Sequence, residues 1–177
     1  MQQIPYMNNF NIKVLNPEDW ALYKSVRLES LKDSPDSFGA TYEQESVLSD
    51  ADWQARLDLN ARGLVAFPLV AEQGGRAMGL AWGVIHAPEV ETAHIYQMWV
   101  SPAARGQGIA KALLGEIKTW AIDKECECLA LDVTTSNEAA VCLYRSSGFM
   151  ATGQPVLLRK DSSLMMQAML MALHGAG

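Results

Sequence analysis

Residues 100–111 read VSPAARGQGIAK and carry the pattern that most constrains the fold. An apolar run leads into this stretch, a loop with Gly106 and Gly108 follows, and a helical pattern then opens. Glycine lets backbone amides approach a ligand closely, and a helix N-terminus adds free N–H groups and the positive end of a dipole. The stretch therefore predicts a cradle for a pyrophosphate, to which Arg105 and Lys111 would add charge.

Hydrophobic periodicity and turn residues predict the elements on both sides of this loop. The predicted strands are 11–15, 64–72, 77–87, 92–100, 129–133, 149–159 and 164–173. The predicted helices are 16–32, 49–62, 107–124 and 137–147, with a loop over 36–48. The strand–helix–strand unit from 92 to 133 requires a right-handed parallel crossover, whereas the turn at 73–76 predicts an antiparallel hairpin. We therefore expect an α/β (α+β) fold with a mixed sheet flanked by helices.

Composition narrows the class of protein. The chain has 177 residues, 49% of them hydrophobic and 19% charged, which predicts a single globular domain over 11–177 after a flexible N-terminus at 1–10. The net charge of −6 argues against nucleic acid or an anionic membrane as a partner. Three cysteines without zinc-type spacing predict free thiols and no metal site. With no apolar run long enough for a membrane span and no signal-peptide pattern, we expect a cytoplasmic protein.

Three nucleotide-binding patterns compete for the glycine loop. A P-loop requires a Gly-Lys-Ser/Thr ending, which is absent. A dinucleotide fingerprint requires a third glycine where Lys111 stands, in an all-parallel sheet that the predicted hairpin contradicts. The third pattern is Arg/Gln-x-x-Gly-x-Gly/Ala, which Arg105, Gly108 and Ala110 match.

A second motif follows at 137–149, NEAAVCLYRSSGF. Asn137 and Tyr144 are seven residues apart and project from one face of the predicted helix, with the small Ala140 between them. The two motifs, in this order, resemble the signatures of the GNAT N-acetyltransferase superfamily, and DSPDSFGATYEQE at 33–45 resembles a bacterial branch of it. The resemblance covers most of the chain.

The resemblance implies a GNAT acyl-CoA N-acyltransferase fold, mainly antiparallel, with a cleft where two central parallel strands diverge. It also implies acetyl-CoA as cosubstrate, with Asn137 on the pantetheine arm and Tyr144 serving the departing thiol. Backbone groups near Met98 and Val100 would pair with pantetheine like an added strand. The cofactor-binding residues expected on this basis are Met98, Trp99, Val100, Arg105, Gly106, Gln107, Gly108, Ile109, Ala110, Lys111, Asn137, Ala140 and Tyr144.

The chemistry expected is direct transfer of an acetyl group to a primary amine, which needs a proton acceptor for the amine and a hydrogen bond or proton for the thiolate. A phenol with a pKa near 10, above the roughly 8.5 of a thiol, lets Tyr144 give that proton or hydrogen bond. Strand alternation places His94, Tyr96, Met98 and Val100 on one face. His94 and Tyr96 would then point toward the acceptor, with His94 as a candidate base.

Other readings stay open for several residues. Glu43 and Glu45 are weaker base candidates, better interpreted as part of a solvated loop, and His86 and His174 are interpreted as incidental. The acceptor could be a small amine, toward which the negative net charge mildly steers cations, or a protein N-terminus or lysine. A non-catalytic CoA-binding module is the alternative of another class, and a homodimer is possible.

Overall fold

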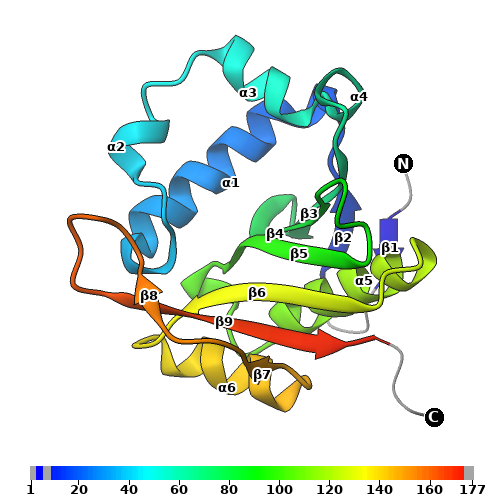
Figure 1. The fold of residues 1–177 in the computed structure, drawn as a ribbon. Coiled ribbons are helices and arrows are strands. Elements are labelled where there is room, and N and C mark those ends of the chain that lie inside the picture. Colours follow the sequence, from blue (N-terminus) through cyan, green and yellow to red (C-terminus); the bar gives the residue numbers. More distant parts are fainter. Residues whose placement is uncertain (1–2, 6–8, 174–177) are drawn as a thin grey trace.

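Nine strands of one sheet organise the part of the chain that the computed structural model describes, residues 3–5 and 9–173. The strand order is β1-β2-β3-β4-β5-β6-β9-β7, and β8 also pairs with β9 (Figure 1). Only the β5–β6 pair is parallel. The strands are β1 (Gln3–Pro5), β2 (Asn11–Val14), β3 (Val65–Gln73), β4 (Arg76–Ile85), β5 (Thr92–Val100), β6 (Cys128–Thr134), β7 (Met150–Ala151), β8 (Val156–Leu157) and β9 (Met165–Ala172). The expected mixed, mainly antiparallel sheet is confirmed.

Six α-helices connect the described strands: α1 (Trp20–Asp33), α2 (Tyr42–Glu45), α3 (Asp50–Leu57), α4 (Leu59–Arg62), α5 (Ile109–Asp123) and α6 (Glu138–Ser146). Short 3₁₀ turns precede or follow three of them, at Pro17–Asp19, Pro35–Ser37 and Pro102–Ala104. A capping box begins the 3₁₀ turn that leads into α1, since Asn16 accepts a hydrogen bond from the Glu18 amide and Asp19 accepts one from the Asn16 amide.

The structure differs from the sequence prediction in four segments, where helices and strands are shorter or more numerous than expected. The long strand expected over 149–159 is wrong, because only β7 and β8 pair with β9 there. The helix expected over 49–62 is broken at Asp58, whose side chain caps the short α4. The loop expected over 36–48 contains α2, and β1 pairs with β2 within the N-terminal segment. Part of the flexible segment expected at 1–10, residues 1–2 and 6–8, lies outside the described residues, as does His174.

Two apolar cores lie on opposite faces of the sheet. Neighbouring residues of β3 alternate between them, since Leu69 and Ala71 face one core and Val70 the other. The first, which we name the α5 core, includes Ile109, Leu113, Ile117, Leu129, Tyr144 and Phe149. The second, the α1 core, includes Tyr23, Val26, Leu31, Trp53, Trp82 and Trp99. The sheet is therefore the middle layer, with α5 and α6 on one side and α1 and α3 on the other.

The parallel strands β5 and β6 separate after three paired positions. Their pairing runs from Thr92 with Cys128 to His94 with Ala130 and then stops. Both strands nevertheless continue, β5 to Val100 and β6 to Thr134. The expected diverging parallel pair is thus confirmed, and the divergence leaves one edge of each strand without a strand partner among the described residues.

A β-bulge interrupts β5 at Gln97, which has a φ of 58°. The register against β4 shifts between Leu80 and Trp82, so that Gln97 and Met98 together face a single residue of β4. A bulge inserts one residue into the alternation and so exchanges the faces of all residues beyond it.

The expectation that His94, Tyr96, Met98 and Val100 share one face is therefore wrong. His94 and Tyr96 pair with residues of β4 on the α1 side. Met98 and Val100, beyond the bulge at Gln97, pack against the α5 core instead. The acceptor-side and cofactor-side positions of β5 thus lie on opposite faces of the sheet.

Helix α5 lies so close to β4 that a side chain larger than glycine does not fit at position 83. A Cβ there would lie 2.8 Å from Cζ3 of Trp120 and 3.0 Å from Cγ2 of Ile117. Trp120 cannot move freely, since its ring stacks on Phe67 with centroids 5.4 Å apart. We expect Gly83→Ala to lower the free energy of unfolding by about 1–3 kcal/mol, as overpacking does, measured by urea titration.

Gly115→Ala is the matched control, because Gly115 is exposed on α5 and a Cβ there meets nothing within 4 Å. Alanine in a helix interior is favoured over glycine, so this variant should gain roughly 0.5–1 kcal/mol. Equal effects of the two substitutions would contradict the close packing of α5 on β4.

Candidate active site

The diverging ends of β5 and β6 form the walls of a cleft of about 700 Å³. Residues 95–100 line one side of it and residues 131–134 the other, and these are the segments that no longer pair with each other. Helix α6 forms the floor, and the α1–α2 loop, through Ser37 and Phe38, overhangs it. The loop is tied in place because Thr134 Oγ1 donates to the Asp36 carbonyl at 2.7 Å.

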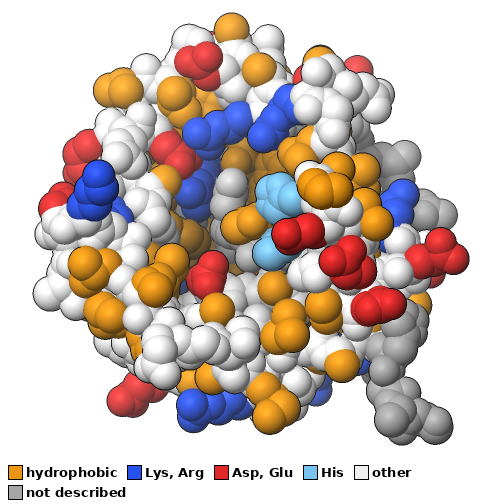
Figure 2. Space-filling view, viewed as in Figure 1, with side chains coloured by type: hydrophobic (Ala, Val, Ile, Leu, Met, Phe, Trp, Pro, Cys, Tyr) orange, Lys and Arg blue, Asp and Glu red, His pale blue; other side chains and the backbone are white. Residues whose placement is uncertain are grey.

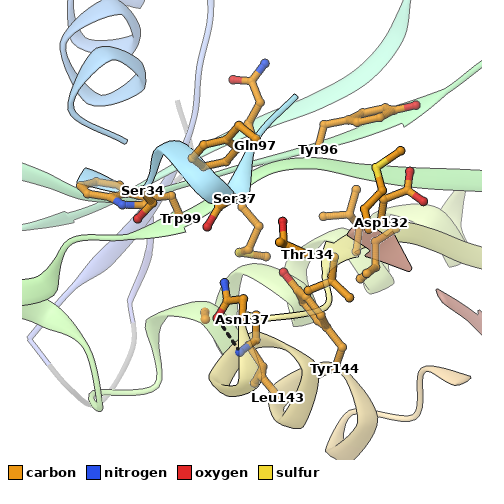
Figure 3. Close-up of a pocket in the computed structure, with 18 of the residues that line it drawn as sticks. Ser34, Ser37, Tyr96, Gln97, Trp99, Asp132, Thr134, Asn137, Leu143 and Tyr144 are labelled. Atoms are coloured by element: carbon orange, nitrogen blue, oxygen red, sulfur yellow. Dashed lines mark hydrogen bonds between the residues drawn. The ribbon is translucent and has the colours of Figure 1, made fainter. Parts of the chain in front are cut away.

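Asn137 and Tyr144 both line this cleft, as their spacing predicts. Figure 3 shows them rising from the two ends of α6 into the same space, with Thr134 beside them. Asn137 is the N-cap of α6, and its Oδ1 accepts from the Ala140 amide at 3.2 Å. Its side-chain N–H groups have no partner among the described residues and remain to hydrogen-bond a carbonyl lying in the cleft.

Tyr144 is 6% exposed and packs edge-to-face against Phe149. Burial raises the pKa of its phenol to about 12. The phenol is therefore protonated throughout the neutral range and can donate a hydrogen bond. This pKa lies above the value of about 8.5 for a thiol, which favours a hydrogen bond from the Tyr144 phenol to a thiolate over full transfer of the proton.

The glycine loop has the backbone geometry of an anion cradle. Gly106 and Gly108 have φ of 79° and 85°, values that L-residues rarely adopt, and a Cβ at either would point into open space. Gly108 is the N-cap of α5 and has no side chain with which to cap this helix. The N-terminus of α5 therefore directs its first-turn N–H groups and the positive end of its dipole toward a bound phosphate.

Arg105 is held at the mouth of the cleft by Asp33, the last residue of α1. Asp33 Oδ2 accepts from Arg105 Nη2 at 2.9 Å, from Trp99 Nε1 at 2.9 Å and from Ser34 Oγ at 2.7 Å. Burial raises the pKa of this carboxyl, but the bonds from Trp99, Ser34 and Arg105 outweigh burial and hold the pKa below its usual value. Arg105 also donates to the Val100 carbonyl at 3.0 Å, so α1, β5 and the glycine loop meet in one hydrogen-bonded cluster.

The remaining expected cofactor-binding residues fall into three groups. Ile109 and Trp99 are buried in the two cores, so only their backbone or ring edges are available to a ligand. Lys111 is exposed on α5, and Gln107 accepts a hydrogen bond from Gln73 Nε2 at 2.7 Å. Four further residues line the cleft: Met98, Val100, Ala110 and Ala140. Their cofactor contacts stay predictions.

A second hollow of about 330 Å³ lies on the α1 side of β5. It shares Tyr96 and Gln97 with the cleft, so the two spaces meet across the bulge. Its other lining residues include Arg56, Arg62 and His86. Figure 2 shows a hollowed face with basic side chains along its upper rim and both described histidines on one side.

His86, not His94, lines this hollow. His86 Nε2 lies 2.9 Å from the hydroxyl of Tyr96, which is 40% exposed. The His94 ring packs beside both, 5.3 Å from His86 and 6.0 Å from Tyr96 between centroids. Burial and the neighbouring His86 lower the pKa of His94. Sequence reasoning interpreted His86 as incidental, because no motif accompanies it, and only the fold brings its ring beside Tyr96.

The interpretation of Glu45 as part of a solvated loop is wrong, because Glu45 lies buried in α2. Its carboxylate accepts from Arg27 Nε and Nη2 at 3.0 and 3.2 Å and from Arg56 Nη1 at 2.9 Å. The Glu45 and Arg27 side chains are 8% and 5% exposed. Burial raises the pKa of Glu45, but the two arginines outweigh burial and hold it below the usual 4.5. Glu43, on the same short helix, is exposed.

The family described as the Acetyltransferase (GNAT) family matches residues 27–149. This match covers the second half of α1, the central strands, the glycine loop and α6, so it includes both motifs and most of the residues that line the cleft. The chain belongs to the GNAT acetyltransferase family.

The chain matches only part of the length of its relatives. A mycothiol acetyltransferase of Pseudarthrobacter chlorophenolicus is 32% identical over 114 residues, which are 62% of this chain and 35% of that protein. A probable N-acetyltransferase family 8 member 5 of Mus musculus is 31% identical over 116 residues, 64% of this chain and 50% of that protein. The chain thus spans about a third to a half of the curated relatives it matches.

Solved structures share the fold at lower identity. A putative acetyltransferase from Salmonella typhimurium, yncA, determined with its cofactor acetyl-CoA, has a TM-score of 0.76 at 19% identity and covers 96% of each chain. Within residues 3–5 and 9–173, no helix is long and apolar enough to cross a membrane. The same residues contain no cluster of three or more histidine, cysteine or acidic side chains that could hold a metal ion.

Removing the negative charge of Glu45 tests the buried ion cluster. Glu45→Gln leaves the buried Arg27 guanidinium without a counter-charge, and we expect a loss of about 3 kcal/mol in the free energy of unfolding at pH 7. Because the folded pKa of Glu45 is lowered, its contribution is present above about pH 4.5 and is lost as the pH falls through the folded pKa. Urea titrations at pH 7 and below pH 4 measure both values.

Glu43→Gln is the control on the same helix and should change stability by less than about 0.5 kcal/mol, since its side chain is exposed. A difference between wild type and Glu45→Gln that persists undiminished at low pH would contradict the assignment.

Proposed function

We propose that this protein transfers the acetyl group of acetyl-CoA directly to a primary amine. The observation that carries the proposal is the cleft between the unpaired ends of β5 and β6, which has a helix N-terminus suited to a pyrophosphate at its mouth and a buried phenol at its floor. Membership of the GNAT family and the acetyl-CoA complex of the Salmonella typhimurium structure support the choice of cosubstrate.

Different residues bind different parts of acetyl-CoA. The amides around Gly106 and Gly108 bind the pyrophosphate, with Arg105 as a cation at the same mouth. The free edge of β5 from 95 to 100 offers backbone groups to the pantetheine amides, as a sheet edge does to an added strand. Asn137 donates to a pantetheine carbonyl. The thioester then lies near Tyr144, deep in the cleft.

Transfer forms one C–N bond, breaks one C–S bond and moves one proton from the amine to the sulfur. Proximity supplies much of the effect, because both reactants lie in one cleft. Tyr144 stabilises the leaving thiolate by a hydrogen bond and keeps its own proton, as its pKa of about 12 requires. The sulfur acquires its proton afterwards from solvent or from the protonated base.

The amine proton has a route through Tyr96 to His86. Tyr96 lines both spaces, and its hydroxyl lies 2.9 Å from His86 Nε2. Burial and the nearby Asp132 raise the pKa of Tyr96, so the phenol does not ionise by itself but can pass a proton to the imidazole as it accepts one. His86 is thus the proton acceptor that the geometry favours, and His94 packs behind it.

The Tyr144 hydroxyl provides the sharpest test of the cleft. We expect Tyr144→Phe to lower kcat by about 10–100-fold, the value of one hydrogen bond to a charged group, with little change in acetyl-CoA affinity. Because the phenol pKa is about 12, wild-type kcat should show no fall from its ionisation below about pH 11. Thiol-release kinetics and calorimetric titration with acetyl-CoA measure these values.

Tyr42→Phe is the matched control, since Tyr42 lies on α2 and lines neither space. Tight acetyl-CoA binding without turnover on any amine would favour a CoA-binding module, and no binding by folded protein would refute the proposal. A protein N-terminus or lysine as acceptor is distinguished by testing peptides beside small amines.

Two histidine substitutions separate the candidate bases. We expect His86→Gln to lower kcat/KM by about 100-fold, because a positioned base contributes on that order, and His94→Gln to lower it by less than about tenfold. Initial rates across pH 5–9 measure both, with thermal unfolding as the check on folding. The reverse ranking would assign the proton transfer to His94.

A further inference from the structure

The hollow on the α1 side of β5 carries a charge opposite to that of the whole chain. Two guanidinium groups, those of Arg56 and Arg62, face it, and the single acid in its lining is Glu45. The charge of Glu45 is already compensated by the buried Arg27, which donates a hydrogen bond to each of its two carboxylate oxygens. The arginines therefore act on the hollow as an unbalanced positive field, although the chain as a whole has a net charge of −6.

Arg62 is the freer of the two arginines. Its Nη1 donates to the Arg56 carbonyl at 2.7 Å, which anchors the side chain, and its other N–H groups have no partner among the described residues. Arg56 is fixed more firmly, because it donates to Glu45 and lies over the Trp53 ring at 4.7 Å. Its side chain nevertheless remains 30% exposed. Planar guanidinium donors held in this way match the geometry of a carboxylate or a phosphate.

The hollow is also placed where the body of an acceptor must lie. It opens onto the cleft at Tyr96 and Gln97, the same residues that border the expected position of the thioester. An amine that reaches the thioester from this side leaves the rest of its molecule between β4, β5 and α4. At about 330 Å³ the hollow accommodates a small molecule, not a folded domain.

We propose that the acceptor is a small primary amine that bears an anionic group, a carboxylate or a phosphate, which Arg56 and Arg62 bind. This inference rests on the proposed acetyl transfer and specifies its acceptor. It disfavours polyamines, because a second cationic centre would face two arginines and no free acid. The steering of cations expected from the net charge is overridden by the charges that line the hollow.

Matched pairs of amines test the anionic group. The panel pairs α-amino acids and ω-amino acids of increasing length with their carboxamides, and glucosamine 6-phosphate with glucosamine, and it adds spermidine. We expect kcat/KM for at least one anionic member to exceed that of its neutral partner by tenfold or more, with spermidine among the poorest acceptors. The carboxylate and phosphate pairs distinguish the two sources of the anion.

Arg62→Gln should reduce that ratio toward one, whereas Lys118→Gln should leave it unchanged. Lys118 is exposed on α5 and lines neither space, so this control removes the same charge without touching the hollow. A ratio that falls equally in both variants would show general electrostatic steering and overturn the proposal. So would neutral amines or spermidine that are acetylated as well as the anionic members.

A binding measurement keeps the inference separate from the proposed function. Calorimetric titration of the same pairs into the CoA-bound protein requires no turnover. Tighter binding of the anionic members that Arg62→Gln abolishes would support the hollow as an anion site even if transfer failed. Equal affinities, or no binding by any member of the panel, would overturn it, whereas absence of acetyl-CoA binding would refute the proposed function instead.

Discussion

The separation of β5 from β6 beyond His94 is the constraint on which the site depends. A strand edge deep in a sheet is normally satisfied by its neighbour, and unsatisfied backbone groups are costly where water is excluded. Here the two strands continue side by side without pairing, and the space between them is the cleft. The backbone groups that the fold leaves open are those that a ligand with regularly spaced amides can satisfy. The fold thus offers backbone contacts to such a ligand without a dedicated side chain for each contact.

The bulge at Gln97 directs the side chains before and after it to opposite faces of β5. The Tyr23 hydroxyl donates to the Gln97 side chain at 2.9 Å and so ties the bulge to the α1 core. Beyond the bulge, Met98 and Val100 pack toward the α5 core, while Tyr96 before it faces the second hollow. A regular strand would have placed all these side chains on one face. The irregular backbone therefore places the proposed cofactor and acceptor sides next to each other across one strand.

Sequence reasoning succeeded where local chemistry decides structure. Gly106 and Gly108 have the positive φ values that only glycine adopts readily, and Asn137 caps the helix that carries Tyr144. It failed where tertiary contacts decide. The residues around Gln97 do not indicate a bulge, since Met98, Trp99 and Val100 are all apolar and so fit either face of the sheet. The His86–Tyr96 contact and the burial of Glu45 between two arginines likewise depend on register and on the packing of α1 against α2.

The charges of this chain show why a global property is a poor guide to a local site. Most of the excess acidic groups are exposed, where solvent and salt screen them over about 10 Å. Arg27 and Glu45 are buried, and Glu45 accepts hydrogen bonds from both Arg27 and Arg56, so its single negative charge is opposed by two positive charges at close range. What remains at the second hollow is set by Arg56 and Arg62, because they are the charged groups nearest to it that are not fully neutralised. A ligand entering the hollow experiences this field and not the net charge of −6.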